Sequence, residues 1–332
     1  MRFKTAIPAA EILRHCEALI QKTGPANRPL PGLHVESMDA PDLSGPGSIT
    51  FLGAGSPLRM REGISAALIL AEPGVVVPEG ILLFRVPSIH TAMSVLIKAL
   101  SDRLQRPESF QARTSPTLEG NRIERGAVVD GHLEGDVYVG SGAYIGRGSY
   151  VGSGTRIEAN ATVQENCCIG RNCVIQSGAV IGCAGFGFFA GDRGLQAMPH
   201  LAGVEIGDDC WIGANAVVAA GVLNPTSLGR GCKLDSHVQI AHNVRLGENA
   251  LLASQSGIAG STVVGKRFQM GGAASVDGHL LIGDDVSVAA CSGVTKDQPN
   301  KSVVAGFPAK PIGEWRREKI ALRRMGKELR KD

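Results

Sequence analysis

An aliphatic residue returns at every sixth position from Leu228 to Val294, and this period constrains the fold more than any other feature of the chain. An α-helix repeats its apolar face every three to four residues and a half-buried strand every two, so neither gives a strict period of six. The period predicts a hexapeptide β-helix, in which three hexapeptides close one triangular coil of about 18 residues. The twelve positions in register are Leu228, Leu234, Ile240, Leu246, Leu252, Ile258, Val264, Met270, Val276, Ile282, Val288 and Val294.

The same period occurs earlier, at nine positions from Leu133 to Ile181 and at three from Ile206 to Val218. Together these stretches predict eight coils, stacked about 4.8 Å apart. Residues 182–203 interrupt the period with the segment Gly185-Phe186-Gly187-Phe188-Phe189. A loop that carries aromatic residues away from the coils favours a binding role, so Phe186 and Phe188 are candidate substrate contacts. The alternative is a loop that only covers an apolar patch.

Residues 1–112 lack the sixfold period, and we expect them to form an α/β domain that binds a nucleotide or another part of the substrate. Pro8 can begin a first helix, and Ser88 can cap a second. Short apolar runs at 48–52, 66–70 and 81–86 are strand candidates. Residues 113–300 would then form the β-helix and residues 301–332 a basic helical extension.

The net charge is only +3, and it is unevenly distributed. Residues 313–332 carry eight Lys and Arg against four acids, which leaves the rest of the chain close to neutral. The eight cysteines form no CxxC pair, which favours packed thiols in a reducing compartment. No apolar run is long enough for a signal peptide or a membrane span. We therefore expect a cytoplasmic protein without a membrane span and without a nucleic-acid partner.

Two histidines occupy related places in the repeat. His242 follows Ile240 by two residues, and His279 follows Val276 by three. Their separation of 37 residues is two coils plus one residue, which places them about 10 Å apart along the prism. The spacing predicts that both imidazoles border one cleft.

Four stretches together resemble the UDP-3-O-acylglucosamine N-acyltransferases of lipid A synthesis. They are the GFGF segment at 185–188, QIAHNV at 239–244, GGAASVDGH at 271–279 and EWRR at 314–317. The resemblance implies a mainly β fold, a left-handed parallel β-helix with an N-terminal α/β domain and a C-terminal helix. It also implies a homotrimer with active sites between subunits.

The resemblance further implies transfer of a 3-hydroxyacyl chain from acyl carrier protein to the 2-amine of a UDP-linked acylglucosamine. His242 would be the general base and Asp235 the acid that orients it. His279 would lie near the substrate phosphates or the oxyanion, and the Gly260 amide would be the oxyanion donor. We expect no metal and no cofactor besides the phosphopantetheine of the carrier protein. The remaining candidates are Phe51, Asn243 and Gly293 for substrate, and Arg316, Arg317, Arg323 and Arg324 for the carrier protein.

The chain departs from the family pattern in two places. After Phe51, Ala54 and Pro57 replace the Asn and Tyr that usually complete the uracil site. Residues 218–226 read VAAGVLNPT, which lacks three charges of the usual segment. These departures raise the alternative of a paralogue that acylates a different nucleotide-linked amino sugar.

Three other interpretations stay open at this point. The first is a sugar N-acetyltransferase that uses acetyl-CoA. The second is a metalloenzyme of the γ-carbonic anhydrase type, in which His200, His237 and His242 would bind zinc. The third is a scaffold that keeps the fold without catalysis. Outside the zinc interpretation, we expect His200 and His237 to be ordinary solvated or structural histidines.

Overall fold

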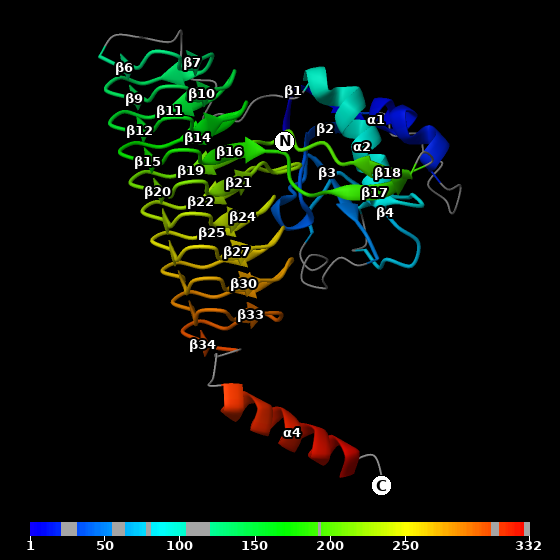
Figure 1. Cartoon of the computed structure of the whole chain (residues 1–332). Coiled ribbons are helices and arrows are strands. Elements are labelled where there is room, and N and C mark those ends of the chain that lie inside the picture. The colour runs from blue at the N-terminus through cyan, green and yellow to red at the C-terminus, as the bar shows by residue number, and fades with distance from the viewer. Residues whose placement is uncertain are drawn as a thin grey trace.

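The computed structural model describes residues 1–20, 32–54, 64–77, 81–103, 120–191, 194–306 and 312–328. They form three parts: a small α/β domain, a long prism of parallel strands beside it, and a C-terminal helix beyond the last coil (Figure 1). The expected boundary at residue 112 lies outside the described residues.

The prism consists of three parallel sheets of ten, nine and eight strands, and successive strands of the chain pass from one sheet to the next. Sheet 1 contains β6 (Arg122–Ile123), β9 (Tyr138–Val139), β12 (Arg156–Ile157), β15 (Val174–Ile175), β20 (Trp211–Ile212), β23 (Lys233–Leu234), β26 (Leu251–Leu252), β29 (Gln269–Met270), β32 (Ser287–Val288) and β34 (Val303–Val304). Sheet 2 contains β7 (Val128–Val129), β10 (Tyr144–Ile145), β13 (Thr162–Val163), β16 (Val180–Cys183), β21 (Val217–Ala219), β24 (Gln239–Ile240), β27 (Gly257–Ile258), β30 (Ser275–Val276) and β33 (Gly293–Val294). Sheet 3 contains β8 (His132–Leu133), β11 (Tyr150–Val151), β14 (Cys167–Ile169), β19 (Val204–Ile206), β22 (Thr226–Leu228), β25 (Arg245–Leu246), β28 (Val263–Val264) and β31 (Leu281–Ile282).

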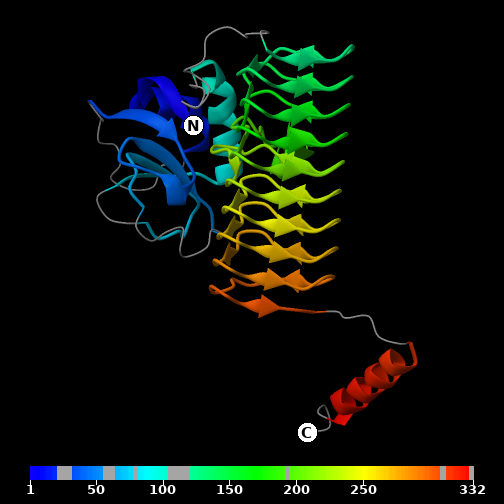
Figure 2. The same cartoon turned by 90° about the vertical axis from the view of Figure 1, so that its left-hand side faces the viewer.

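The coil is left-handed, as expected. Sheet 1 forms the left side of the prism in Figure 1 and faces the viewer in Figure 2, where its strands run from left to right. The right side of Figure 2 is the front of Figure 1, so the chain comes forward on the left while it descends. Seen from the top of Figure 1, the chain therefore turns counterclockwise as it moves away from the viewer, which is a left-handed coil.

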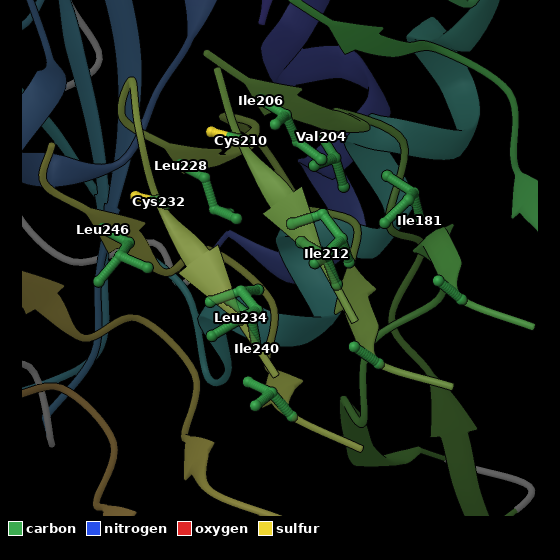
Figure 3. Close-up of a cluster of buried hydrophobic side chains, with 14 of the residues drawn as sticks. Ile181, Val204, Ile206, Cys210, Ile212, Leu228, Cys232, Leu234, Ile240 and Leu246 are labelled. Atoms are coloured by element: carbon green, nitrogen blue, oxygen red, sulfur yellow. The ribbon is translucent and has the colours of Figure 1, made fainter. Parts of the chain in front are cut away.

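The sixfold period arises because nearly every short strand points one aliphatic residue into the prism, which is the second residue in most two-residue strands. These side chains stack from coil to coil and form one continuous buried core. Burying each of them stabilises the fold by roughly 1.5–3 kcal/mol relative to exposure. Figure 3 shows part of this core, with Ile181, Val204, Ile206, Cys210, Ile212, Leu228, Cys232, Leu234, Ile240 and Leu246.

The prism is longer than the period indicated. Its described strands number 27, which makes nine coils where eight were expected. Two of the three additional strands lie at the start, where β6 and β7 precede Leu133. Only Asp130 and Gly131 connect β7 to β8, and this short connection breaks the period. Gly131 is needed there because a Cβ would lie 2.9 Å from the Ser149 carbonyl oxygen. At the other end, β34 lies beyond residue 300 and still pairs with β32.

The N-terminal domain has one five-stranded sheet, in the order β1-β2-β3-β4-β5. Pro8 precedes the first helix and the Ser88 hydroxyl caps the second through the Thr91 N–H at 3.3 Å, as expected. The strands expected at 48–52, 66–70 and 81–86 are present, whereas β1 and β2 were not foreseen. The elements are β1 (Arg2–Pro8), α1 (Ala9–Cys16), η1 (Glu17–Leu19), β2 (His34–Met38), η2 (Pro41–Leu43), β3 (Ser48–Leu52), β4 (Leu68–Ala71), β5 (Leu82–Arg85), α2 (Ile89–Leu100) and η4 (Ser101–Arg103).

The aromatic interruption forms an antiparallel hairpin that leaves the prism between β16 and β19. Its strands are β17 (Phe188–Gly191) and β18 (Gly194–Ala197), and they lie beside α2 (Figure 1). Phe189 and Met198 enter the same buried cluster as Phe51 of the N-terminal domain. The hairpin therefore connects the α/β domain to the prism through shared hydrophobic packing.

The C-terminal helix α4 (Ile312–Glu328) lies beyond the last coil (Figures 1 and 2). Arg316, Arg317 and Arg323 are exposed, while the Arg324 side chain is outside the described part. None of the helices in the described residues combines the length and apolar composition needed to cross a bilayer.

Candidate active site

A cavity of about 450 Å³ lies where the prism, the hairpin and the N-terminal domain meet. The prism contributes the corner between sheets 2 and 3. The chain on either side of the hairpin contributes residues 186–188, Met198 and His200, and the N-terminal domain contributes η2, Phe51 and the start of α2. Six of the predicted site residues line it: Phe51, Phe186, Phe188, His242, Asn243 and His279. The expectation that His242 and His279 border one cleft is confirmed.

His242 occupies the first turn position between β24 and β25, and Gly260 occupies the same position one coil on. The Ser261 N–H donates to the His242 carbonyl at 2.9 Å, which fixes this stacking. A Cβ on Gly260 would lie 2.7 Å from Nε2 of His242, and one on Gly185 would lie 2.6 Å from its Cβ. Because real Cβ contacts are essentially never this short, both positions must be glycine for the imidazole to keep its place.

His279 occupies the second turn position, two coils beyond Asn243, and has a φ of 60°. This left-handed conformation costs roughly 1–2 kcal/mol for most residues and least for Gly, Asn and Asp. Asn occupies the equivalent place in several other turns, including Asn160, Asn166 and Asn172. Ser261, Arg267 and Ala273 adopt the same conformation in equivalent turns, so the coil itself imposes it, and the turn places the imidazole of His279 at the cavity.

Asn243 determines which nitrogen of His242 carries the hydrogen. The Asn243 Oδ1 accepts the Val222 N–H at 2.8 Å, so the amide nitrogen Nδ2 is the atom that faces His242 Nδ1 at 3.0 Å. Nδ2 can only donate, so Nδ1 is the acceptor. Neutral His242 within a single chain therefore carries its hydrogen on Nε2.

Burial, together with the smaller effects of the nearby His200 and His279, lowers the pKa of His242 to about 4. Desolvation disfavours the charged imidazole, and a second cation beside it has the same effect. His242 is consequently neutral at pH 7, which is the form that a general base needs.

His200 was expected to be an ordinary histidine, and the structure places it against His242. The two ring centroids are 5.1 Å apart and the rings are nearly perpendicular, at 68°. His200 follows β18 and lines the cavity. No pattern in the sequence indicates this contact, because it depends on where the hairpin docks.

The aromatic candidates lie on two sides of the cavity. Phe51 is buried, with 3% exposure, whereas Phe186 is 89% and Phe188 54% exposed. The rings of Phe186 and Phe188 meet edge to face at 5.2 Å. Ala54, at the altered uracil site, donates its N–H to Glu72 Oε2 at 2.8 Å. Pro57 lies outside the described residues.

Gly293 and Asp235 are predicted site residues that lie away from the cavity. Gly293 lies on β33, at the open end of the prism. Asp235 lies in the exposed turn between β23 and β24, where it accepts from the N–H groups of Ser236 and Ser254 at 2.7 and 3.1 Å. It borders a separate groove of about 600 Å³ along sheet 1, whose walls include the exposed side chains of Trp211 and Leu251.

The stretch 218–226 anchors the N-terminal domain to the prism. Asn224 accepts from the Ala40 N–H at 2.9 Å and donates to Asp39 Oδ1 at 3.1 Å. Close by, Arg245 of β25 forms an ion pair with Asp42 of η2. Residues 222–225 also line the cavity, so the departure from the family pattern changes its wall.

The zinc interpretation lacks a site in the described part of the chain. His237 is exposed on the turn between sheets 1 and 2, whereas His200 and His242 lie at the corner between sheets 2 and 3. No group of three His, Cys, Asp or Glu side chains among the described residues is arranged to hold a metal ion. The three expected zinc ligands are therefore not brought together.

Comparison with known proteins supports the repeat and the resemblance. The family described as bacterial transferase hexapeptide (six repeats) matches residues 148–183, and the hexapeptide repeat of succinyl-transferase matches residues 203–238. A UDP-3-O-acylglucosamine N-acyltransferase of Caulobacter sp. (strain K31) is 44% identical over 148 residues, or 45% of this chain and 44% of that protein. A protein of the same name from Bordetella parapertussis is 39% identical over 154 residues, or 45% of this chain and 42% of that protein.

Among solved structures, the UDP-N-acetylglucosamine O-acyltransferase of Moraxella catarrhalis RH4 is 24% identical, with a TM-score of 0.49, over 58% of this chain and 72% of that one. The chain spans less than half the length of the curated relatives described above. The similarity to these relatives confirms the resemblance predicted from the sequence. The chain is a hexapeptide-repeat β-helix protein that, over nearly half its length, is similar to proteins named UDP-3-O-acylglucosamine N-acyltransferase.

Proposed function

We propose that the protein is an N-acyltransferase that moves a 3-hydroxyacyl chain from acyl carrier protein to the 2-amine of UDP-3-O-acylglucosamine, in the cytoplasm, as a step of lipid A synthesis. The observation that carries this proposal is the meeting of His242 and His279 in one cavity at a corner of the prism. The names of the relatives supply the substrate class.

In the proposed reaction the amine attacks the thioester carbonyl, and His242 removes the proton that the nitrogen then carries. The neutral state of His242 supports this role. The Gly260 amide or His279 would stabilise the oxyanion. Collapse of the tetrahedral intermediate expels the thiolate of phosphopantetheine, which takes up the proton held by His242 and so restores the neutral base. The protein itself would need no cofactor.

A general base at Nε2 requires the hydrogen of His242 to be on Nδ1. Within one chain Asn243 donates to Nδ1 instead, and Asp235 lies at another corner. We propose that the protein is a homotrimer in which Asp235 of the partner subunit accepts from Nδ1 of His242. The exposed apolar groove beside Asp235 supports burial of this face against another copy.

The carrier protein would dock on α4. Its exposed side chains Arg316, Arg317 and Arg323, together with Arg324 of the same helix, would attract an acidic partner and raise the association rate. Phe186 and Phe188 would contact the substrate beside the cavity. Gly293 lies on β33 in line with Ser275, and its lack of a side chain would leave room for a long acyl chain.

The test is acyl transfer from 3-hydroxyacyl carrier protein to UDP-3-O-acylglucosamine by the wild type and by His242→Ala. A loss of about a hundredfold or more in kcat is the expected effect of removing a general base. His237→Ala is the matched control, because His237 is an exposed turn residue of the same prism and its loss should leave kcat unchanged. A fully active His242→Ala protein would disprove the role of the base.

A second candidate is transfer to a different nucleotide-linked amino sugar, from acyl carrier protein or acetyl-CoA. The observation in its favour is that residues 222–225 line the cavity and that Asn224 is already bonded to Asp39 and Ala40. A wild type that folds normally but ignores UDP-3-O-acylglucosamine, and turns over another amino sugar, would favour this candidate.

A further inference from the structure

His200 has a buried nitrogen whose role the reaction described above does not explain. Its Nδ1 lies 2.8 Å from the Met198 carbonyl oxygen. Since that oxygen can only accept, the hydrogen of the neutral ring is on Nδ1 and Nε2 carries the lone pair. Nε2 is buried without a hydrogen-bond partner. An unsatisfied buried acceptor destabilises a fold, so its presence calls for an explanation.

The backbone of the GFGF segment closes over this nitrogen. A Cβ on Gly185 would lie 2.7 Å from Nε2 of His200 and 2.8 Å from Cδ2 of His242. A Cβ on Gly187 would lie 3.0 Å from Cε1 of His200. Because both positions are glycine, the backbone of this segment packs directly against the two imidazoles. A side chain at Gly185 would clash with both rings and displace at least one of them.

The two rings are also coupled through charge. A proton on one ring makes a proton on the other unfavourable, because both cations would lie in a partly buried site with centroids 5.1 Å apart. Desolvation lowers the pKa of His200 as well, although its bond to the Met198 carbonyl opposes this effect. The other titratable or charged groups facing the cavity are His279, His90, Asp39, Asp42 and Arg245, the last paired with Asp42.

We propose that His200 is a positioning residue for His242: it holds the ring of His242 edge-on in the cavity, and the pair accommodates at most one proton. The consequence for catalysis rests on the function proposed above. His242 stays neutral in moderately acidic solution and is ready to accept the proton of the attacking amine. The relationship between the two rings is a property of the fold and can be tested without turnover.

The first experiment follows the imidazole resonances of the full-length protein by NMR as the pH is lowered, in the wild type and in His200→Gln. Glutamine can still donate to the Met198 carbonyl but cannot ionise. We expect His242 to become protonated at a higher pH in His200→Gln than in the wild type. His90→Gln is the matched control, since His90 lines the same cavity without a ring contact to His242. In that variant His242 should become protonated at the same pH as in the wild type.

The second experiment measures kcat/KM of His200→Gln relative to the wild type between pH 5 and 8. The ratio cancels the ionisation of the substrate amine. We expect a ratio within about threefold of unity at pH 8, where both rings are neutral, and a further fall of about twofold or more at pH 5, because burial still lowers the pKa of His242 in the variant. A purely structural role would lower the ratio equally at every pH.

His200→Phe keeps a ring of similar size without a titrating nitrogen, and it should shift the titration of His242 in the same direction. It serves as the test if His200→Gln does not fold. An unchanged His242 titration in a folded variant, or a ratio that does not vary with pH, would overturn the proposal. A wild type inactive on the proposed substrates would reject the proposed function, while the NMR titration would still decide the role of His200.

Discussion

Asn243 donates its Nδ2–H to Nδ1 of His242 across 3.0 Å, while its own Oδ1 is held by the Val222 N–H. Within a single chain, the backbone thus determines the orientation of the Asn243 amide, and the amide determines the tautomer of His242. Replacement of this one side chain should therefore change the chemistry of His242 without any change to His242 itself.

We expect Asn243→Asp to raise the pKa of His242. The carboxylate can still accept the Val222 N–H, and its second oxygen would then face Nδ1 and favour the charged imidazolium. NMR titration of His242 should show protonation at a higher pH than in the wild type, and the acid limb of the activity profile should move the same way. Asn249→Asp is the control, because Asn249 has the same positive φ in a turn away from the cavity. A lower pKa in Asn243→Asp would contradict the hydrogen placement.

Gly260→Ala should abolish most activity with little loss of fold stability. Its Cβ would lie 2.7 Å from the His242 ring atoms Cε1 and Nε2, so the ring has to move. A displacement of about 1 Å in a catalytic group can cost about a hundredfold in rate. Gly278→Ala is the matched control one coil further along, where the new Cβ would meet the Gly260 carbonyl oxygen at 3.1 Å. Equal kcat values for the two variants would show that activity does not depend on the absence of a side chain at position 260 beside His242.

Comparison of His279→Asn with His279→Ala should separate the effect of the turn conformation on stability from the effect of the imidazole on activity. Both remove the ring and should reduce activity. Asn tolerates the φ of 60° better than Ala, so the Ala variant should be less stable by about 1 kcal/mol. Chemical denaturation measures this difference. His237→Asn tests the turn alone, since His237 has a φ of 61° outside the cavity; it should be fully active.

The stability of the protein should fall as the pH is lowered below the usual pKa of histidine. The pKa of His242 is about 4 in the folded chain and near 6.5 in an unfolded one. Between these values the unfolded state binds more protons, so the free energy of unfolding decreases as the pH falls through this range. His242→Gln should lose less stability than the wild type between pH 7 and 4, as measured by denaturant titration. Parallel curves would show that His242 does not contribute to this dependence.

The sequence predicted most of the prism because its period reports directly on which side chains point inward. Leu234, Ile240 and Leu252 are all buried in the core, as expected. The prediction missed β6 and β7, because the two-residue connection at Asp130 and Gly131 interrupts the spacing of six before Leu133. It also missed β1 and β2, which are short and have no period of six.

The position of a candidate site residue could be predicted only where its spacing in the hexapeptide repeat specifies which corner of the prism it occupies. Residues separated by about 36 positions return to the same corner, which is why His242 and His279 meet. Asp235 precedes His242 by seven positions, close to one hexapeptide, and so lies at the neighbouring corner. His200 belongs to a hairpin outside the repeat, and its place follows from the docking of Phe189 and Met198 on the N-terminal domain.

The stacking of coils has a consequence for how this protein can change over time. A change of length within the regular coils can move a group on one corner of the prism relative to another only in whole steps of about 4.8 Å. An insertion or deletion there of anything but a complete coil would carry every later residue to a different face. Loss of one coil between His242 and His279 would bring them one step closer and leave each on its corner. The hairpin between β16 and β19 escapes this restriction, since the chain leaves and rejoins the prism there, and so length can vary there without disturbing the spacing of the two histidines.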